Sequence, residues 1–165
     1  MRSRKTQKRI DPIAQFMQEH DEMLMHLSSL NKATSSIAVN GFSVDAHNRI
    51  HAAMHFIQDE VGVHNRREEE ALFPVLERYV EGPTRIMRED HKQLKKDFVK
   101  VQRILKRLDK KKEDQAVAVE LQETSKAMVQ RFVNHIHKEN HILFPLVQKF
   151  LTKDALREVA RRMLQ

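Results

Sequence analysis

The chain has 165 residues with 30 Lys and Arg against 23 Asp and Glu, a formal net charge of +7, and it is 40% hydrophobic and 32% charged. With only 3 Gly and 4 Pro, this composition is typical of one all-helical domain rather than a β-rich fold. The absence of cysteine excludes disulfides, thiolate metal sites and a cysteine nucleophile, so any metal here must bind nitrogen and oxygen.

The positive charge is concentrated in two segments. Residues 1–10 hold five Lys or Arg and no acid, and residues 95–112 hold nine against two Asp. Such runs usually mark a disordered tail and a solvated helix face, which we expect here, with contact to nucleic acid or an anionic membrane as the alternative. Residues 11–165 are expected to form one domain. No apolar run reaches the roughly 20 residues of a membrane helix, and no secretory signal is visible, which predicts a cytoplasmic protein without a transmembrane segment.

The first half of the chain is predicted to hold two helices. The first spans about 11–33 and starts with an Asp-Pro pair, a capping residue followed by proline at the first helical position. Segment 34–43 is rich in Ser and Asn, which favours a connection. The second helix is predicted over about 45–79, with a bend or local adjustment near Gly62 and Pro74.

The second half repeats this arrangement. Gly82-Pro83 separates the halves, a third helix is predicted over about 84–108, and a lysine-rich turn follows at 110–112. A fourth helix is predicted over 113–150, and a short last helix over 152–164, capped by its first residue. Short connections give antiparallel neighbours, so the sequence predicts an all-α, up-down-up-down four-helix bundle with a short C-terminal fifth helix.

The two halves match one another at a fixed offset of 71 residues. None of the other six histidines falls on a histidine when it is moved by the same offset, so coincidence explains the matches poorly. The repeat predicts two helical hairpins related by approximate two-fold symmetry, each supplying half of one site. The offset pairs His20 with His91, His64 with His135, Glu68 with Glu139, and Leu72-Phe73-Pro74 with Leu143-Phe144-Pro145.

The paired histidines and glutamates are predicted to face the bundle interior. His64 and Glu68 are four residues apart and therefore about 40° apart on a helical wheel, as are His135 and Glu139. All four paired histidines lie in apolar stripes. Four imidazoles and two carboxylates in one dry layer are costly unless a cation compensates them. The stripes contain Ile57, Val61, Ala71 and Val75 on the second helix, and Met128, Phe132, Ile142 and Leu146 on the fourth.

Two metal ions suit this ligand set better than one. Six inward ligands exceed a tetrahedral site, and the two-fold arrangement places a glutamate bridge on each side. Imidazole and carboxylate ligands fit iron, manganese or zinc, with iron favoured where coordination positions stay open. Two divalent ions exceed the charge of two carboxylates, so an oxo or hydroxo bridge is expected as well. Such a centre leaves room for O2, NO or peroxide.

These motifs resemble the hemerythrin-like, or HHE cation-binding, domains, from about residue 11 to the C-terminus. The resemblance implies a four-helix bundle with a non-haem di-iron centre. The oxygen-carrying hemerythrins have a further histidine where this chain has Lys95, and His-x4-Asp on the last helix where this chain has His-x3-Glu, so the site looks more like HHE proteins linked to NO, peroxide or iron-centre repair. The resemblance implies terminal ligands His20, His64, His91 and His135 and bridging ligands Glu68 and Glu139.

Three functions follow from this reading. The first is a di-iron protein that binds or senses a small diatomic ligand, O2 or NO. The alternative is a di-iron enzyme that reduces NO or peroxide, or a protein that donates iron for iron-centre repair; the electron donor is not identified, and no general acid stands out to make the chain an enzyme. The third is an interaction module that uses the basic tail and the basic end of the third helix.

Several other polar residues near these motifs are expected to have structural or solvent-exposed roles rather than to bind metal. Lys95 is expected to extend to solvent rather than to meet a bound anion. His47, His51 and His55 form a ridge along one helix face, which we interpret as solvated or inter-helical rather than as a metal patch. Glu69 or Glu70 would replace Glu68 as a ligand only if the helix bulged, and the residues at their offset, Asn140 and His141, do not support this.

Overall fold

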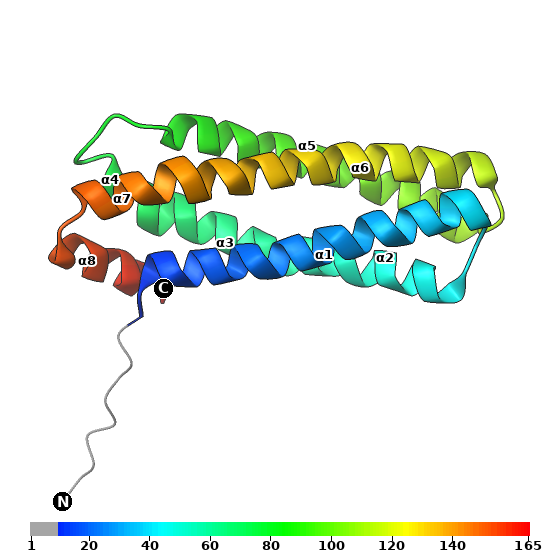
Figure 1. Cartoon of the computed structure of the whole chain (residues 1–165), viewed down its shortest axis with the longest axis horizontal. Helices are drawn as coiled ribbons and strands as arrows, with labels where there is room; N and C mark the ends of the chain where they lie inside the picture. The colour runs from blue at the N-terminus through cyan, green and yellow to red at the C-terminus, as the bar shows by residue number, and fades with distance from the viewer. Residues whose placement is uncertain (1–9) are drawn as a thin grey trace, which may run out of the picture.

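The computed structural model describes residues 10–165, which form four long antiparallel helical segments and a short C-terminal helix (Figure 1). We call each long segment a rod, because two of them combine α-helical and π-helical pieces. The predicted all-helical bundle with a short C-terminal helix is confirmed. Residues 1–9, most of the predicted basic tail, lie outside the described residues. The first rod is α1 (Pro12–Asn40); the second is α2 (Val44–Phe56), η1 (Ile57–Val61), α3 (Gly62–Arg67), η2 (Glu68–Leu72) and α4 (Phe73–Leu76); the third is α5 (Thr84–Lys110); the fourth is α6 (Gln115–Lys138), η3 (Glu139–Leu143) and α7 (Phe144–Phe150); and α8 (Lys153–Met163) follows.

Side-chain caps define where several helices start. The carboxylate of Asp11 accepts hydrogen bonds from the backbone N–H groups at the start of α1, with Pro12 next to it, as predicted. Ser43, Asp114 and Thr152 accept the same kind of bond at the starts of α2, α6 and α8. Each cap satisfies a donor that the helix cannot pair internally.

The first connection is shorter than predicted, because α1 continues to Asn40 instead of ending near residue 33. Thr34 and Ile37, both 1% exposed, pack into the bundle. The hydroxyl of Thr34 donates to the carbonyl of Leu30, one turn earlier. Burial of this face therefore outweighs the weak helix preference of the Ser and Asn residues. The helix ends only at Gly41, whose φ of +89° suits glycine.

The second and fourth rods carry π-helical turns directly before their Phe-Pro pairs. Phe73 donates its N–H to the carbonyl of Glu68, five residues earlier, and Phe144 donates to Glu139 in the same way. Proline lacks an N–H and crowds the carbonyl four residues earlier, so a wider turn lets each rod continue through it. The expected adjustment near Pro74 is thus a π-turn, and the turn changes which side chains face inward.

This phase change corrects one core prediction. Ile142 was expected on the buried stripe of the fourth rod, but it is 51% exposed, while the adjacent Leu143 is fully buried. An α-helical wheel carried across η3 has the wrong phase, because the π-turn contains one extra residue. The stripe residues before that turn, Met128 and Phe132, are buried as predicted.

Two apolar clusters fill the bundle on either side of one polar layer. Along α1, the buried Ile13 and Phe16 belong to one cluster, His20 follows, and Met23 and Leu27 belong to the other. The other rods show the same order. In Figure 1, α8 lies at one end of the bundle next to the start of α1, and its buried face belongs to the cluster at that end. No helix among residues 10–165 is long and apolar enough to cross a membrane.

We predict that Gly41→Ala lowers the free energy of unfolding by about 1–3 kcal/mol, because its backbone conformation is almost restricted to glycine. Denaturant unfolding measures this. The matched control is Gly62→Ala, an exposed helical position with open space around the added methyl group, which should stabilise by about 0.4–1 kcal/mol. Equal effects at the two positions would contradict the backbone argument.

Candidate metal centre

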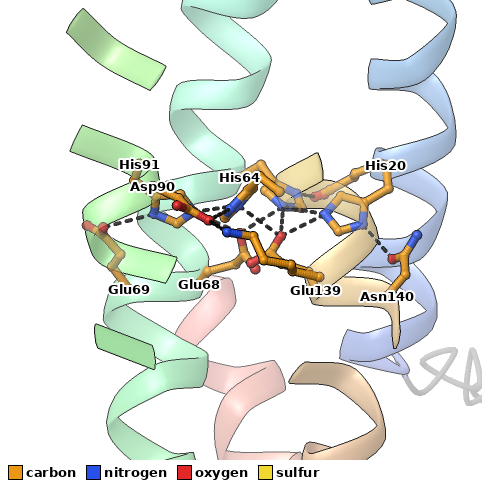
Figure 2. Close-up of polar contacts among 11 residues, drawn as sticks. His20, His64, Glu68, Glu69, Asp90, His91, Glu139 and Asn140 are labelled. Atoms are coloured by element: carbon orange, nitrogen blue, oxygen red, sulfur yellow. Dashed lines mark hydrogen bonds and ion pairs between the residues drawn. The ribbon is translucent and has the colours of Figure 1, made fainter. Parts of the chain in front are cut away.

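All six residues predicted as metal ligands meet in the polar layer between the two apolar clusters. Figure 2 labels all of them except His135. Each is a buried residue, and the most exposed of them, His91, is 7% exposed. All four rods contribute, so the layer exists only when the whole bundle is assembled. His20 comes from α1, His64 from α3, Glu68 from the start of η2, His91 from α5, His135 from α6 and Glu139 from the start of η3.

The four histidines form two pairs. In the first pair, the Nε2 atoms of His20 and His64 lie 3.2 Å apart. In the second pair, the Nε2 atoms of His91 and His135 lie 3.1 Å apart. Each ring therefore directs Nε2 inward and Nδ1 outward. Each hairpin contributes one pair, because the first two rods carry the first pair and the last two rods carry the second.

The two glutamates lie between the pairs. One oxygen of each carboxylate, Oε1, approaches the Nε2 of one histidine from the first pair and one from the second. Each carboxylate therefore lies between one histidine of each pair, where it could help to hold a cation bound by either pair. The Oε1 of Glu68 lies 3.0 Å from His64 and 3.6 Å from His91, and the Oε1 of Glu139 lies 3.0 Å from His20 and 3.4 Å from His135.

The two buried carboxylates have too few hydrogen-bond donors around them. Both oxygens of Glu68 and the Oε2 of Glu139 are buried and accept no hydrogen bond. A buried carboxylate oxygen without a partner is costly, and a cation is the partner that fits these positions. Four imidazole nitrogens and two carboxylates suit iron, manganese or zinc, so the residues present fit the predicted pair of ions.

Comparison with known families agrees with this geometry. The model of the hemerythrin HHE cation binding domain matches residues 11–147. The chain belongs to this family. A comparison with curated proteins finds no match. Family membership and the buried His/Glu layer together indicate an HHE domain that binds metal ions.

Protons and metal ions compete for this HHE layer. Burial alone would lower the pKa of His64, but neighbouring carboxylates, Glu68 first, raise it well above its ordinary value. Burial would likewise lower the pKa of His135, but Glu139 and other acids raise it to about 9. Burial would raise the pKa of Glu139, yet its contacts with Glu68 and the histidines hold it well below its usual range. Protons on the histidines thus balance the negative charge of the carboxylates until a metal ion displaces these protons.

A layer of acids lies behind the histidines. The Nδ1 of His135 lies 3.0 Å from Asp90, which also pairs with Lys138. At the related position, the Nδ1 of His64 lies 3.5 Å from Glu19, and Arg67 lies 3.8 Å from the same oxygen of that acid. Such outer partners fix the ring orientation and increase the basicity of the ligand nitrogen.

The remaining two histidines have unlike partners. His91 donates through Nδ1 to the carboxylate of Glu69 at 2.9 Å, and His20 donates to the amide oxygen of Asn140 at 2.7 Å (Figure 2). The pair His91 and His135 is therefore supported by two close carboxylates, whereas the first pair has one more distant carboxylate and an amide. The two halves of the centre are related in geometry but not in charge.

We did not predict this outer layer from the sequence, although a signal was present. The offset of 71 residues that pairs the ligands also carries Glu19 onto Asp90, Arg67 onto Lys138, and Glu69 onto Asn140. Glu68 rather than Glu69 lies in the buried layer, because Glu69 contacts His91 from the outer side.

The other polar residues lie away from the centre. Lys95 is exposed, which agrees with its predicted extension to solvent, and Glu70 is exposed too. His47 and His51 contact Asp109 on α5, as an inter-helical ridge would. His55, the third member of the predicted ridge, is exposed and pairs with Asp59 within its own rod.

We predict that replacing a ligand reduces both metal content and thermal stability. His64→Ala or His135→Ala should remove about half or more of the bound metal and lower Tm, because metal binding contributes to the free energy of folding. Elemental analysis and thermal unfolding measure the two effects. The control is His137→Ala, an exposed residue two positions from His135. Unchanged metal content in His64→Ala would count against its role as a ligand.

We also predict that Glu69→Gln weakens metal binding by about 10–100-fold, the usual effect of losing an outer partner of a histidine ligand. The substitution removes the charge behind His91 while keeping nearly the same side-chain shape. Competition with a chromophoric chelator measures the affinity. Glu70→Gln is the matched control, because this neighbour is exposed. Equal affinities of the two variants would disprove the outer role of Glu69.

Proposed function

We propose that this HHE domain holds two bridged iron ions and uses them to bind or sense a small diatomic ligand, O2 or NO. The observation that supports it is the set of side chains in the layer: two pairs of histidines with two glutamates between them, which would hold the ions. This leaves coordination positions free of protein ligands. Iron bound there would supply open positions and a change of oxidation state for the small ligand.

Aromatic side chains form the apolar wall next to the centre. Phe144 stacks near His20 with ring centroids 5.4 Å apart, and Phe73 stacks near His91 at 6.0 Å. These two phenylalanines are related by the same offset of 71 residues. Both are at most 1% exposed, so this side of the layer is dry and favours a small, uncharged ligand over a charged or bulky one.

The scarcity of proton donors near the centre favours ligand binding over catalytic turnover. Besides the six ligands, four polar residues among 10–165 are buried: Thr34, Thr84, Asp97 and Ser125. These side chains bond elsewhere, for example Asp97 with Arg131 at 3.2 Å. Reduction of NO or peroxide requires proton delivery, and the outer acids reach the centre only through histidine rings. The enzyme that reduces NO or peroxide therefore stands second, and iron donation is the other alternative.

Stopped-flow mixing of the reduced, iron-loaded protein with O2, NO or peroxide tests the proposal. We expect one stable adduct per centre with O2 or NO, which reverses when the gas is removed. Lys95→Gln should behave as the unchanged protein does, because Lys95 points to solvent. Many turnovers of NO or peroxide would favour the enzyme, and iron release to an acceptor would favour iron donation.

A further inference from the structure

Outside the buried centre, a second cluster contains side chains of the types that bind metal ions. His47 and His51 are four residues apart on α2, and both rings direct Nε2 at the Oδ1 of Asp109 on α5, at 2.6 Å and 2.9 Å. The two rings meet edge to face with centroids 4.7 Å apart. Three potential ligand atoms from two helices thus converge on one point.

The cluster is far from the buried centre. Asp109 follows His91 by 18 residues along α5, which corresponds to about 27 Å along a helix. It lies near the end of the bundle that carries the connections 41–43 and 111–114 (Figure 1). The cluster therefore joins the first hairpin to the second at the end opposite to α8, and shares no residue with the centre.

The sequence alone favoured a plain inter-helical ridge, but the contact of two of its histidines with one carboxylate changes this interpretation. We propose that His47, His51 and Asp109 form a surface site for one divalent transition-metal ion of the zinc type. Two imidazoles and a carboxylate are a common ligand set for such ions, and water would complete the coordination. The spacing of four residues places both rings on one helix face, as a shared ion requires. Side-chain exposure of 46% for His51 and 33% for Asp109 gives the ion access from solvent.

The same atoms also explain how the cluster holds together without an ion. Partial burial alone would raise the pKa of Asp109, but hydrogen bonds from His51 and His47 hold it below its ordinary value. The carboxylate is therefore ionised and accepts from both rings. When a cation binds the two Nε2 atoms, each neutral ring would carry its proton on Nδ1 instead, so the ion replaces the hydrogen bonds to Asp109 and keeps the same three atoms together.

The surroundings select among cations. Lys112 lies over the ring of Phe42, with its Nζ 5.7 Å from the centroid, and that ring also contacts His47. Nearby positive charge opposes ions held mainly by charge, and Mg²⁺ and Ca²⁺ prefer oxygen ligands. Coordination to imidazole nitrogen is less dependent on net charge. We therefore expect Zn²⁺, Cu²⁺ or Ni²⁺ to bind, and Mg²⁺ and Ca²⁺ not to bind.

Equilibrium dialysis of the iron-loaded protein against micromolar Zn²⁺, followed by elemental analysis of both metals, tests the site. We expect one zinc ion per chain with no loss of iron. His51→Gln should lose that ion although its amide can still donate to Asp109, and Asp109→Asn should lose it too. His55→Gln is the matched control, because His55 is an exposed histidine on the same helix that pairs with Asp59 instead. It should keep the zinc.

Circular dichroism shows whether each variant keeps its helices. A second readout uses the unchanged chain: zinc should raise Tm of the iron-loaded protein and of His55→Gln, and magnesium should raise neither. The proposal is overturned if the unchanged chain binds no additional zinc, if zinc enters only by replacing iron, or if folded His51→Gln and Asp109→Asn bind as much zinc as the unchanged chain.

Discussion

The burial of two carboxylates among four imidazoles is the interaction on which this fold depends. Glu68 and Glu139 are both fully buried, and three of their four oxygens accept no hydrogen bond. Ionised groups in such a position need a cation, whether a metal ion or protonated histidine. The apolar clusters on both sides strengthen this requirement, because they exclude the water that would otherwise solvate the carboxylates.

The duplication explains how one bundle meets this requirement twice. One offset of 71 residues repeats the ligands, the outer acids with their basic partners, the stacked phenylalanines and the prolines behind the π-turns. Each hairpin therefore has the same local structure, in which a π-helical turn starts at the ligand glutamate. The exception is Glu69, whose counterpart is Asn140. The charge difference at this position makes the two halves electrostatically inequivalent.

The features that depend on local sequence patterns could be predicted from the sequence. Helix starts followed from capping residues such as Asp11, and the grouping of the six ligands followed from spacing and repetition. The end of α1 and the exposure of Ile142 were missed, because burial of Ile37 and the extra residue of a π-turn are set by tertiary contacts rather than by local preference. The contact between His51 and Asp109 joins separate helices, so helix periodicity on its own could not predict it.

Under the proposed function, stability and ligand binding are coupled at this centre, because the same ions would complete the core and bind the small ligand. Loss of a ligand such as His64 therefore changes both, and a loss of activity alone would not separate them. The outer residues can separate the two effects. Glu69 is partly exposed and contacts His91 at the outer Nδ1, so we expect its charge to change the basicity of that ligand while the apolar clusters remain packed. We therefore expect the difference between Glu69 and Asn140 to tune one half of the centre independently of the fold.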